Sequence, residues 1–521
     1  MDAQVPISNE LITARFFGTV RRAIADGWRC REPVASIAYG SLAHAPRYLK
    51  AAHHKLSELP LEWREHAAAV VAAVQLRPGE RERLGAYFTP PNLVDHVLRR
   101  LKSYGYEPDR HRIVDPAAGG AAFLAPLYGL IADACSENSR ATKALNLLSG
   151  IEIDARLANV TKDLLAWRLA IARDAEKPDR EDFDAAAGRI NVADTLNMKG
   201  RAKYDVVVGN PPYARIGKDD YERFVQRWPA LTDKGGYLNL SMAFVSHCLE
   251  FVKPGGLLSF VMPAGFIGGP SFAAFRKSIA AEVVAIDRIE KRKGMFLDVI
   301  QDCVVLTMQR AKTRRHFVEV SSLAGDGSET VLGKIKLPRD GDFWQLPSAK
   351  VIATAKSLAD LGWKGKVGAV VPHRWMDRVV SDQRRGSLPL IWAAAIRPDG
   401  SVDYEHMRKR VSGCRAVVDP EVSYVIRRPC LLVQRTSNRK QRRRINAALV
   451  DQNFLDAVGP FVAENHVITL TPPADAPQQH LRQMTKLLNS SETTALYDRI
   501  CGTASVSVKT LLEMKLPVPA D

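Results

Sequence analysis

Residues 206–217 read VVVGNPPYARIG: an apolar run stops at a glycine and gives way to an asparagine, two prolines and a tyrosine. The apolar run is typical of a buried strand. Pro211 and Pro212 have a fixed φ and no backbone N–H, and each restricts the residue before it to extended conformations. We therefore predict a stiff turn at the carboxyl end of a buried strand. The turn presents the Asn210 side-chain oxygen, the Pro211 carbonyl and the Tyr213 ring.

The sequence around this stretch alternates between strand and helix patterns. From about residue 81 to about residue 315, short runs rich in valine and isoleucine end in Gly, Asp or Pro and are followed by helical stretches. This predicts an α/β fold with a mostly parallel sheet and helices on both faces, in which ligands bind beyond the carboxyl ends of the strands. Residues 1–80 show helical spacing and predict an N-terminal helical segment. Residues 316–521 contain short irregular strands, loops and a run of basic residues.

Composition narrows the class of protein. The chain has 521 residues, of which 46% are hydrophobic and 25% charged, which indicates a folded protein of more than one domain. Its net charge of +17 favours a polyanionic partner, nucleic acid before an anionic membrane surface, although a merely soluble basic surface is the alternative. Seven scattered cysteines without a CxxC pair argue for a reducing compartment and against a disulfide framework or a cysteine-rich metal site. The sequence shows no signal-peptide pattern and no long uncharged apolar run, so we expect a cytoplasmic protein that does not bind a membrane. We also expect no metal site.

The residues that follow the predicted strands suggest a small-molecule site. Asp115 ends one strand and precedes a turn of small residues, 117–122, whose backbone can approach a ligand closely. Glu152 ends the next strand, where an acid can accept hydrogen bonds from both ribose hydroxyls, and Asp194 follows a third, where it can accept from an adenine amino group. The alternatives are a plain tight turn and helix caps. Because the small-residue turn holds no lysine or arginine, the pattern suits a nucleoside without phosphates, and S-adenosylmethionine fits it.

The Asn-Pro-Pro turn suits an amine substrate. Two acceptors held side by side match the two hydrogens of an –NH₂ group, and an aromatic ring can stack on a planar group. An amino group conjugated to a ring or carbonyl is a poor nucleophile, because its lone pair is delocalised. Two acceptors draw the nitrogen toward tetrahedral geometry, so that it can attack a sulfonium methyl in line by positioning and electrostatics alone. The alternative is a turn without chemistry.

With these residues in hand, the sequence resembles the gamma-class N6-adenine DNA methyltransferases of bacterial restriction–modification systems, which use S-adenosylmethionine. The resemblance lies in GAYFTPPNLVDHVL (85–98), VDPAAGGAAFL (114–124), GIEID (150–154), ADTL (193–196), GNPPY (209–213) and GMFLDVIQDCVVLTMQR (294–310). It implies a class I methyltransferase domain with a Rossmann-like sheet over residues 81–315 and a mixed α/β target-recognition domain over 316–521. It also implies that the target adenine is flipped out of the duplex.

The resemblance also implies a role for individual residues. The catalytic residues would be Asn210, Pro211, Pro212 and Tyr213. The cofactor would be held by Tyr87, Thr89, Asp115, Ala117, Gly119, Glu152, Ile153, Asp194, Thr195 and Asn210. Tyr213 and Phe296 would stack on the target base, and Phe244 would line the adenine pocket of the cofactor. Ala121 stands where the family usually has glycine, so its Cβ is expected to crowd the cofactor.

The catalytic motif does not name the substrate, because methyltransferases that act on a protein glutamine or on RNA share it. The basic run in the C-terminal part favours DNA phosphates, with a solvated charged face as the alternative. It consists of Arg435, Arg439, Lys440, Arg442, Arg443 and Arg444. We therefore expect double-stranded DNA as the partner in a restriction–modification or phage-defence system. A restriction endonuclease would be a separate protein, since no nuclease motif is evident. An enzyme for RNA or a protein glutamine, or a catalytically silent DNA-specificity subunit, are the alternatives.

Overall fold

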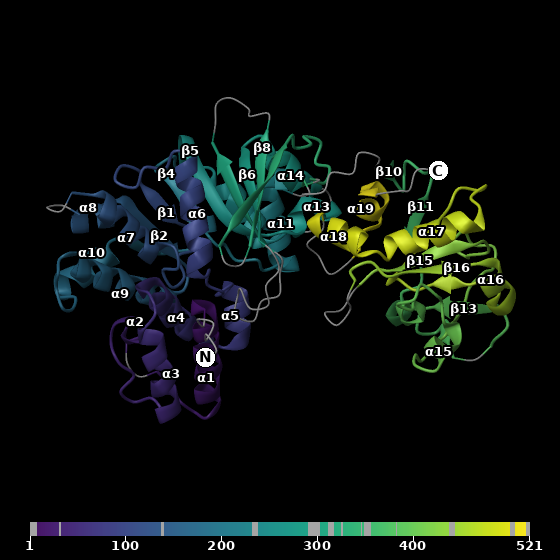
Figure 1. The fold of residues 1–521 in the computed structure, drawn as a ribbon, viewed down its shortest axis with the longest axis horizontal. Coiled ribbons are helices and arrows are strands. Elements are labelled where there is room, and N and C mark those ends of the chain that lie inside the picture. Colours follow the sequence, from purple (N-terminus) through teal and green to yellow (C-terminus); the bar gives the residue numbers. More distant parts are fainter. Residues whose placement is uncertain are drawn as a thin grey trace, which may run out of the picture. The chain divides into compact units, whose positions relative to one another are not determined.

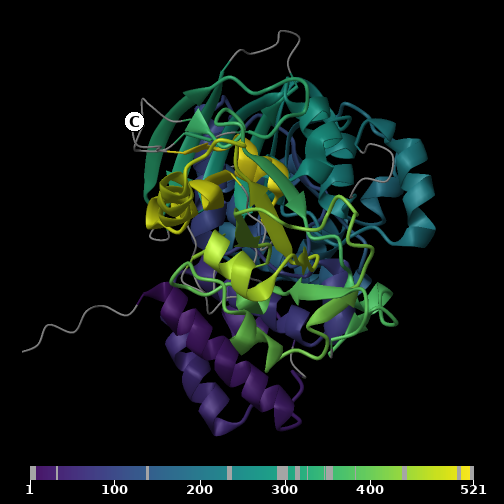
Figure 2. The same ribbon diagram turned by 90° about the vertical axis from the view of Figure 1, so that its right-hand side faces the viewer.

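The computed structural model describes residues 8–30, 33–136, 140–231, 238–289, 303–310, 317–324, 327–344, 346–347, 356–381, 383–436, 443–500 and 506–516. The chain divides into two compact units, whose elements are drawn in Figures 1 and 2. Unit 1 consists of Met1–Pro263 and Lys277–Arg339, and unit 2 of Ala264–Arg276 and Asp340–Asp521.

Unit 1 opens with helices that share one core with its sheet. These are α1 (Asn9–Ala25), α2 (Ser36–Tyr39), α3 (Arg47–Ser57), α4 (Leu61–Val74), α5 (Pro78–Leu84) and α6 (Pro91–Ser103). Helix α1 packs against α3 and α4, and α2 packs against α4. Phe16 and Val71 from these helices belong to the same buried apolar cluster as Ile113 and Val206 from the sheet. The helical segment is therefore part of the body of unit 1.

A buried ion pair joins α4 to α9 (Ala155–Ala172), a helix that packs on the sheet. Glu65 on α4 accepts hydrogen bonds from Arg168 Nε at 2.7 Å and Nη2 at 2.6 Å. The Tyr39 hydroxyl on α2 donates to the same carboxylate. Glu65 and Arg168 are only 3% and 9% exposed. Since a buried charge is tolerated only when it is paired and hydrogen-bonded, each group depends on the other.

The sheet of unit 1 has the strand order β3-β2-β1-β4-β5-β7-β6-β8-β9. Its strands are β1 (Ile113–Asp115), β2 (Leu148–Glu152), β3 (Ile190–Val192), β4 (Tyr204–Gly209), β5 (Val252–Pro263), β6 (Val283–Ile289), β7 (Cys303–Gln309), β8 (Val318–Leu323) and β9 (Glu329–Ile335). Strands β3, β2, β1, β4 and β5 run parallel. Strand β7 is antiparallel to β5 and β6, β8 is parallel to β6, and β9 is antiparallel to β8.

Helices connect the parallel strands: α7 (Leu124–Ala134), α8 (Arg140–Leu147), α9, α10 (Arg180–Ala187), η1 (Thr195–Asn197), α11 (Lys218–Arg227), η2 (Pro229–Leu231) and α12 (Leu240–Cys248). The chain moves outward in one direction from β1 to β3 and in the other from β4 to β5. Right-handed crossovers in opposite directions place their helices on opposite faces of the sheet. The predicted α/β class with a Rossmann-like sheet is therefore confirmed, and its order reverses between β1 and β4.

The sheet continues beyond residue 315, where the sequence pattern had suggested the end of the first domain. Strand β8 pairs in parallel with β6, and β9 pairs with β8, so that the unit runs to Arg339. Conversely, residues Ala264–Arg276 lie within the predicted first domain but belong to unit 2. Arg276 explains that association, because its Nη2 and Nε donate to the Gly341 carbonyl at 2.8 and 3.0 Å.

Unit 2 is a mixed α/β body built on small sheets. Their strand orders are β11-β18-β15-β16, β12-β14-β13-β17 and β10-β19. The strands are β10 (Lys356–Ser357), β11 (Lys364–Val367), β12 (Val379–Val380), β13 (Ser387–Ile391), β14 (Arg415–Val417), β15 (Cys430–Gln434), β16 (Ala447–Val450), β17 (Val462–Ala463), β18 (Val467–Thr471) and β19 (Lys515–Leu516). The helices are α13 (Gly265–Gly268), η3 (Pro270–Phe272), α14 (Ala273–Ile279, which crosses the unit boundary), η4 (Pro372–Arg374), η5 (Ala393–Ala395), α15 (Tyr404–Arg408), α16 (Gln452–Val458), α17 (Gln478–Leu488), α18 (Ser491–Ile500) and α19 (Val508–Glu513). Buried apolar clusters lie between these elements.

No helix in the described part of the chain is both long enough and apolar enough to span a bilayer.

Replacing Glu65 by alanine is expected to lower the free energy of unfolding by about 3–5 kcal/mol, because Arg168 would remain buried without its counter-charge. Denaturant unfolding followed by circular dichroism measures the loss. Arg110→Ala is the matched control. It breaks the Arg110–Glu107 pair, whose side chains are 72% and 52% exposed, and should cost less than about 1 kcal/mol. Equally small losses in both variants would contradict a role for the buried pair in holding α4.

Candidate active site

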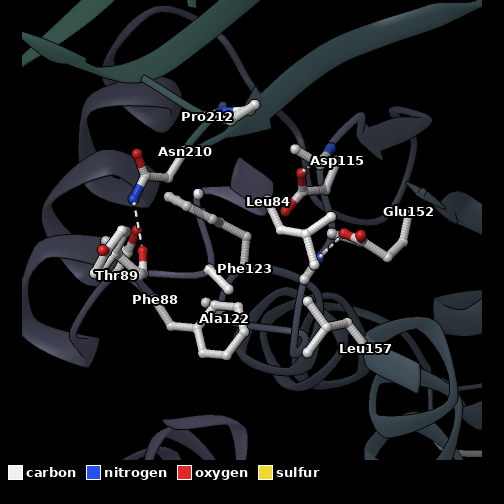
Figure 3. A pocket seen from close by; sticks show the side chains of 16 residues that line it. Leu84, Phe88, Thr89, Asp115, Ala122, Phe123, Glu152, Leu157, Asn210 and Pro212 are labelled. Carbon is white, nitrogen blue, oxygen red and sulfur yellow. Dashed lines mark hydrogen bonds between the residues drawn. The ribbon is translucent and has the colours of Figure 1, made fainter. Parts of the chain in front are cut away.

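A pocket opens in unit 1 at the carboxyl ends of β1, β2 and β4, next to the point where the strand order reverses (Figure 3). Its empty volume is about 420 Å³, including the part that is open to solvent. It is lined by Leu84, Gly85, Ala86, Tyr87, Phe88, Thr89, Asp115, Ala117, Ala118, Gly119, Ala122, Phe123, Glu152, Leu157, Asn210 and Pro212. This is the place at which doubly wound sheets bind ligands.

Asp115 brings a buried carboxyl group to this pocket from the end of β1. It is 1% exposed, and its Oδ1 accepts the Ala117 N–H at 2.9 Å. Strand β4 passes so close that a Cβ on Gly209 would lie 2.7 Å from Asp115 Oδ1. Burial raises the pKa of Asp115 to about 8, and the charge of Glu152 adds to the rise, while the Ala117 N–H opposes it. At neutral pH the carboxyl group is therefore mostly protonated until a cation approaches it.

Glu152 supplies the second carboxyl group from the end of β2. Its Oε2 accepts the Gly119 N–H at 2.8 Å, and its Oε1 accepts the Asp154 N–H at 2.9 Å. Burial raises the pKa of Glu152, whereas these backbone donors lower it. Each carboxylate oxygen can accept a further hydrogen bond, so a ligand with two adjacent hydroxyl groups can be bound here.

The small-residue turn after β1 is pressed between two side chains. A Cβ on Gly119, whose φ is 53°, would lie 2.5 Å from the Phe88 ring. A Cβ on Gly120 would lie 2.6 Å from the Cβ of Ala69 on α4. The turn therefore requires both glycines for packing alone, and α4 forms one wall of it.

Ala121 adopts a left-handed conformation in the same turn. Its φ is 62°, and its side chain is 1% exposed. It is not among the pocket-lining residues, and the crowding of the cofactor expected from the sequence stays a prediction. The structure shows an effect on the backbone, because an L-residue at this φ is strained by about 1–2 kcal/mol.

The segment after α5 forms the opposite wall of the pocket. Thr89 is 1% exposed, and its Oγ1 has no hydrogen-bond partner among the described residues. The Tyr87 carbonyl accepts a hydrogen bond from Asn210 Nδ2 at 3.2 Å, and the Arg81 guanidinium lies 4.7 Å from the centre of the Tyr87 ring. An unsatisfied buried hydroxyl costs free energy, which a ligand can recover by bonding to it.

Gly85 lets this segment pack directly on the Asn-Pro-Pro turn. It ends α5 in a left-handed conformation with a φ of 62°, and a Cβ there would lie 2.7 Å from the Cβ of Pro212. Only glycine combines this φ with this contact. The two motifs, more than a hundred residues apart in sequence, therefore form one structure around the pocket.

Tyr213 is paired with Asn210. Its hydroxyl lies 2.6 Å from Asn210 Oδ1 and 3.1 Å from the Val261 carbonyl, so its single proton is shared between these acceptors. The ring is partly buried against the apolar core of unit 1. Burial raises the pKa of Tyr213 well above its ordinary value, with a contribution from nearby Cys303, so the hydroxyl keeps its proton. Its stacking on a target base stays a prediction.

Asp194 and Thr195 make structural contacts and do not line the pocket. Asp194 Oδ1 accepts the Leu196 N–H at 3.0 Å, and its Oδ2 accepts from Asn197 Nδ2 at 2.7 Å, so it caps η1. The buried Thr195 hydroxyl donates to the Pro116 carbonyl at 2.5 Å, which fastens η1 to the turn after β1. Their contact with a cofactor stays a prediction.

Three other predicted residues are described but do not line the pocket. Ile153 is 54% exposed beside Glu152, Pro211 is buried, and Phe244 is buried on α12. Phe296 lies outside the described residues. Among the described residues, the pocket lining therefore brings together Tyr87, Thr89, Asp115, Ala117, Gly119, Glu152, Asn210 and Pro212, and Tyr213 adjoins this set through its hydrogen bond to Asn210.

The predicted DNA-binding arginines of unit 2 are partly engaged with the backbone. Arg435 Nη1 donates to the Asn465 carbonyl at 3.0 Å, and Arg443 Nη1 donates to the Asn489 carbonyl at 2.9 Å. Arg444 is half-buried. Arg439, Lys440 and Arg442 lie outside the described residues.

The remaining lining residues carry no individually predicted role, although Ala118 and Ala122 belong to the small-residue turn 117–122 that is expected to approach a ligand. These residues are Leu84, Gly85, Ala86, Phe88, Ala118, Ala122, Phe123 and Leu157. Most of them are apolar, and all but Leu84 and Leu157 lie within the motifs 85–98 and 114–124. Leu84 directly precedes the first of these motifs, and Leu157 lies in the first turn of the helix after β2. Their position in the sequence, within or next to the predicted motifs, is the signal that could have identified them.

Ala121→Gly is expected to leave the free energy of unfolding nearly unchanged. The relief of about 1–2 kcal/mol of strain is offset by the lost methyl burial and the greater freedom of glycine in the unfolded chain. Ala125→Gly is the matched control: Ala125 is equally buried but helical, so this variant should lose more than about 1 kcal/mol. Denaturant unfolding of both variants compares them. A loss at residue 121 as large as that at residue 125 would show that the φ of Ala121 is not strained.

Comparison with known proteins agrees with this geometry. Residues 143–290 match the family model described as Eco57I restriction-modification methylase. The chain is 23% identical to the Type II methyltransferase M.BsuBI of Bacillus subtilis, over 84% of this chain and 88% of that protein. It is 24% identical to the Type II methyltransferase M.CvrRI of Paramecium bursaria Chlorella virus XZ-6E, over 76% and 85%.

Solved structures with the same fold include the Type IIL restriction-modification enzyme MmeI in complex with DNA. The TM-score is 0.53 at 12% identity, covering 97% of this chain and 85% of that one. A DrdV–DNA complex has a TM-score of 0.51 at 12% identity, covering 89% of this chain and 58% of that one. The resemblance found in the sequence is therefore confirmed at the level of restriction–modification methyltransferases: residues 143–290 match the methylase family model, and most of the chain is similar to Type II methyltransferases.

Proposed function

We propose that the protein transfers a methyl group from S-adenosylmethionine to the N6 amino group of an adenine flipped out of double-stranded DNA. The observation that carries the proposal is the placement of Asn210. Its side chain lines the same pocket as Asp115 and Glu152, at the carboxyl edge of a doubly wound sheet. An amide acceptor for the target amine thus adjoins a pocket suited to the methyl donor.

The pocket fits the cofactor by the chemistry of its lining. Among the described residues, its lining contains two buried carboxyl groups, a threonine hydroxyl without a hydrogen-bond partner and no lysine or arginine, which suits a cationic nucleoside without phosphates. Asp115 would hold the ammonium group, Glu152 the ribose hydroxyls, and Thr89 the methionine end. When bound, S-adenosylmethionine supplies an electrophilic methyl group on a sulfonium sulfur.

Asn210 and Pro211 would position the target amine. The Asn210 oxygen and the Pro211 carbonyl accept its two hydrogens, which frees the nitrogen lone pair for in-line attack. The Asn210 amide is oriented for this task, because its Nδ2 is held by the Tyr87 carbonyl at 3.2 Å and its Oδ1 is left as the acceptor.

Tyr213 occupies that acceptor before the target arrives. Its hydroxyl lies 2.6 Å from Asn210 Oδ1, so the target amine can bond to this oxygen only after the hydroxyl leaves. Once it has left, the ring is free to stack on the extruded base, as aromatic side chains do with unpaired bases. Binding of the base and release of Tyr213 are therefore one coupled step.

The substrate assignment to DNA is supported by charge and by relatives. The chain carries a net charge of +17 and the basic run 435–444, which suit phosphate contacts. The similar structures of MmeI and DrdV were both determined in complex with DNA. Unit 2 would recognise the target sequence, and a restriction endonuclease, where one exists, would be a separate protein. RNA or a protein glutamine as substrate, and a catalytically silent specificity subunit, are the outcomes that the following experiment distinguishes.

Methylome sequencing of a heterologous host that expresses the protein tests the function directly. We expect N6-methyladenine within one sequence context, and its loss with Asn210→Ala, because removal of one transition-state acceptor costs on the order of 10²–10³ in rate. Unmodified host DNA with the wild-type chain would contradict the proposal. Methylated RNA or glutamine in the same cells would replace it.

Two substitutions at Tyr213 test the coupled step in the same assay and with purified protein. Tyr213→Ala should slow methyl transfer roughly tenfold to a hundredfold, because the stacking ring is lost. Tyr213→Phe keeps the ring and removes the hydroxyl that competes for Asn210, so it should transfer methyl groups at least as well as the wild type. Calorimetry should show nearly unchanged cofactor binding in both, since Tyr213 does not line the pocket. A Tyr213→Phe variant as slow as Tyr213→Ala would contradict the displacement.

The raised pKa of Asp115 predicts that cofactor binding depends on pH. With a pKa of about 8 before the ligand binds, Asp115 is protonated at pH 6–7 and must lose a proton when the ammonium group of the ligand binds. Affinity should therefore increase from pH 6 to pH 7, with proton release detected by titration calorimetry in buffers of different ionisation enthalpy. Asp115→Asn should bind more weakly and without this proton release. Equal heats in all buffers for the wild type would contradict the assignment.

A further inference from the structure

Unit 2 contains a buried carboxylate that is bonded to an exposed imidazole. Glu464 is 1% exposed, whereas the side chain of His466 is 52% exposed. Glu464 Oε2 accepts the backbone N–H of His466 at 2.8 Å and lies 2.8 Å from His466 Nδ1. Glu464 Oε1 accepts the Ala393 N–H at 3.2 Å. Both carboxylate oxygens are thus engaged, and the plane of the imidazole ring is fixed.

These contacts determine which nitrogen of His466 is presented to a partner. Because the carboxylate accepts from Nδ1, that nitrogen carries the hydrogen, and Nε2 is left on the exposed part of the ring. Nε2 accepts a hydrogen bond when the ring is neutral and donates one when it is protonated. Burial of a carboxylate is costly unless it is hydrogen-bonded, and here the bonds orient a surface group.

An arginine lies over the same turn between β17 and β18. The Arg435 N–H donates to the His466 carbonyl at 2.7 Å, and Arg435 Nη1 donates to the Asn465 carbonyl at 3.0 Å. The Asn465 N–H in turn donates to the Val370 carbonyl at 2.8 Å. Arg435 is the first residue of the basic run 435–444. The oriented imidazole of His466 and the guanidinium of Arg435 therefore lie at one turn, and Arg435 begins the basic run in sequence.

We propose that His466, oriented by Glu464 and flanked by Arg435, makes a hydrogen-bonded contact between unit 2 and duplex DNA. The inference rests on the proposed function and assigns it a contact residue outside the catalytic pocket. The group that His466 recognises is a hydrogen-bonding oxygen or nitrogen of the polyanion, either a phosphate oxygen or the major-groove edge of a purine. Arg435 adds positive charge beside it. Glu464 acts through His466 and is a positioning residue.

The test measures binding of the full-length chain to labelled duplexes by fluorescence anisotropy, at two salt concentrations. One duplex carries the sequence that the protein methylates, and the other carries a scrambled sequence. His466→Gln removes an exposed ring and should weaken binding by about threefold to tenfold. His54→Gln is the matched control: His54 lies in unit 1, its side chain is 80% exposed, and it is 3.8 Å from Glu58. It should bind as the wild type does.

The two duplexes identify the group that His466 contacts. If it contacts a phosphate, His466→Gln weakens both duplexes by the same factor and reduces the salt dependence. If it reads a base edge, only the methylated sequence is weakened, and the methylated context broadens in the host. Either result supports the proposal. Wild-type affinity of His466→Gln for both duplexes overturns it.

Glu464→Gln distinguishes two roles of Glu464: orientation of the His466 ring and stabilisation of the local backbone. If Glu464 acts through His466, Glu464→Gln weakens DNA binding, and the double variant binds no more weakly than His466→Gln alone. If Glu464 only braces the backbone, its substitution lowers the melting temperature while DNA binding at low temperature is unchanged, which contradicts the positioning role. The wild type distinguishes failure of this inference from failure of the proposed function. If the wild-type chain methylates DNA and His466→Gln binds both duplexes as the wild type does, the His466 contact is refuted and the proposed function is not.

Discussion

The parallel pairing of β1 with β4 is the constraint on which the site depends. Ile113 is in register with Val206 and Val114 with Val207, so both strands end at the same edge of the sheet. Asp115 and Asn210 then leave that edge together. The contact between Gly209 and Asp115 shows how close this approach is, because any side chain at residue 209 would displace the carboxyl group. The polar groups of the pocket are thus brought together because two buried apolar strands, β1 and β4, are parallel neighbours in the sheet.

The pocket contains several buried polar groups that neither water nor the protein solvates well. Asp115 carries a raised pKa, Glu152 is buried on backbone donors, and the Thr89 hydroxyl has no partner among the described residues. Each of these groups lowers the stability of the ligand-free protein. The burial of the apolar core of unit 1 offsets this cost. A ligand that carries an ammonium group and hydroxyls would satisfy all three at once, so the free energy withheld from folding becomes available for binding.

Much of the pocket could be predicted from the sequence, because the carboxyl ends of parallel strands meet at one edge and the polar residues there can be found by pattern. Asp115, Glu152 and Asn210 were identified in this way. Asp194 shows the limit: a helix cap and a ligand contact both require an acceptor at the start of a helix, and only the observed bonds to η1 reveal the cap. The contact between Gly85 and Pro212, and the sheets of unit 2, depend on pairings distant in sequence, which local pattern does not contain.

The contact between α4 and Gly120 limits where the chain can be cut into independently folding parts. Ala69 fills the space that a Cβ at residue 120 would need, and Glu65 holds α4 to α9. The small-residue turn that lines the pocket is therefore supported by a helix that precedes the predicted motifs in sequence. A gene fusion or recombination event that transferred only the motif-bearing stretch would leave that turn unsupported. The helical segment and the sheet of unit 1 are therefore expected to be inherited together.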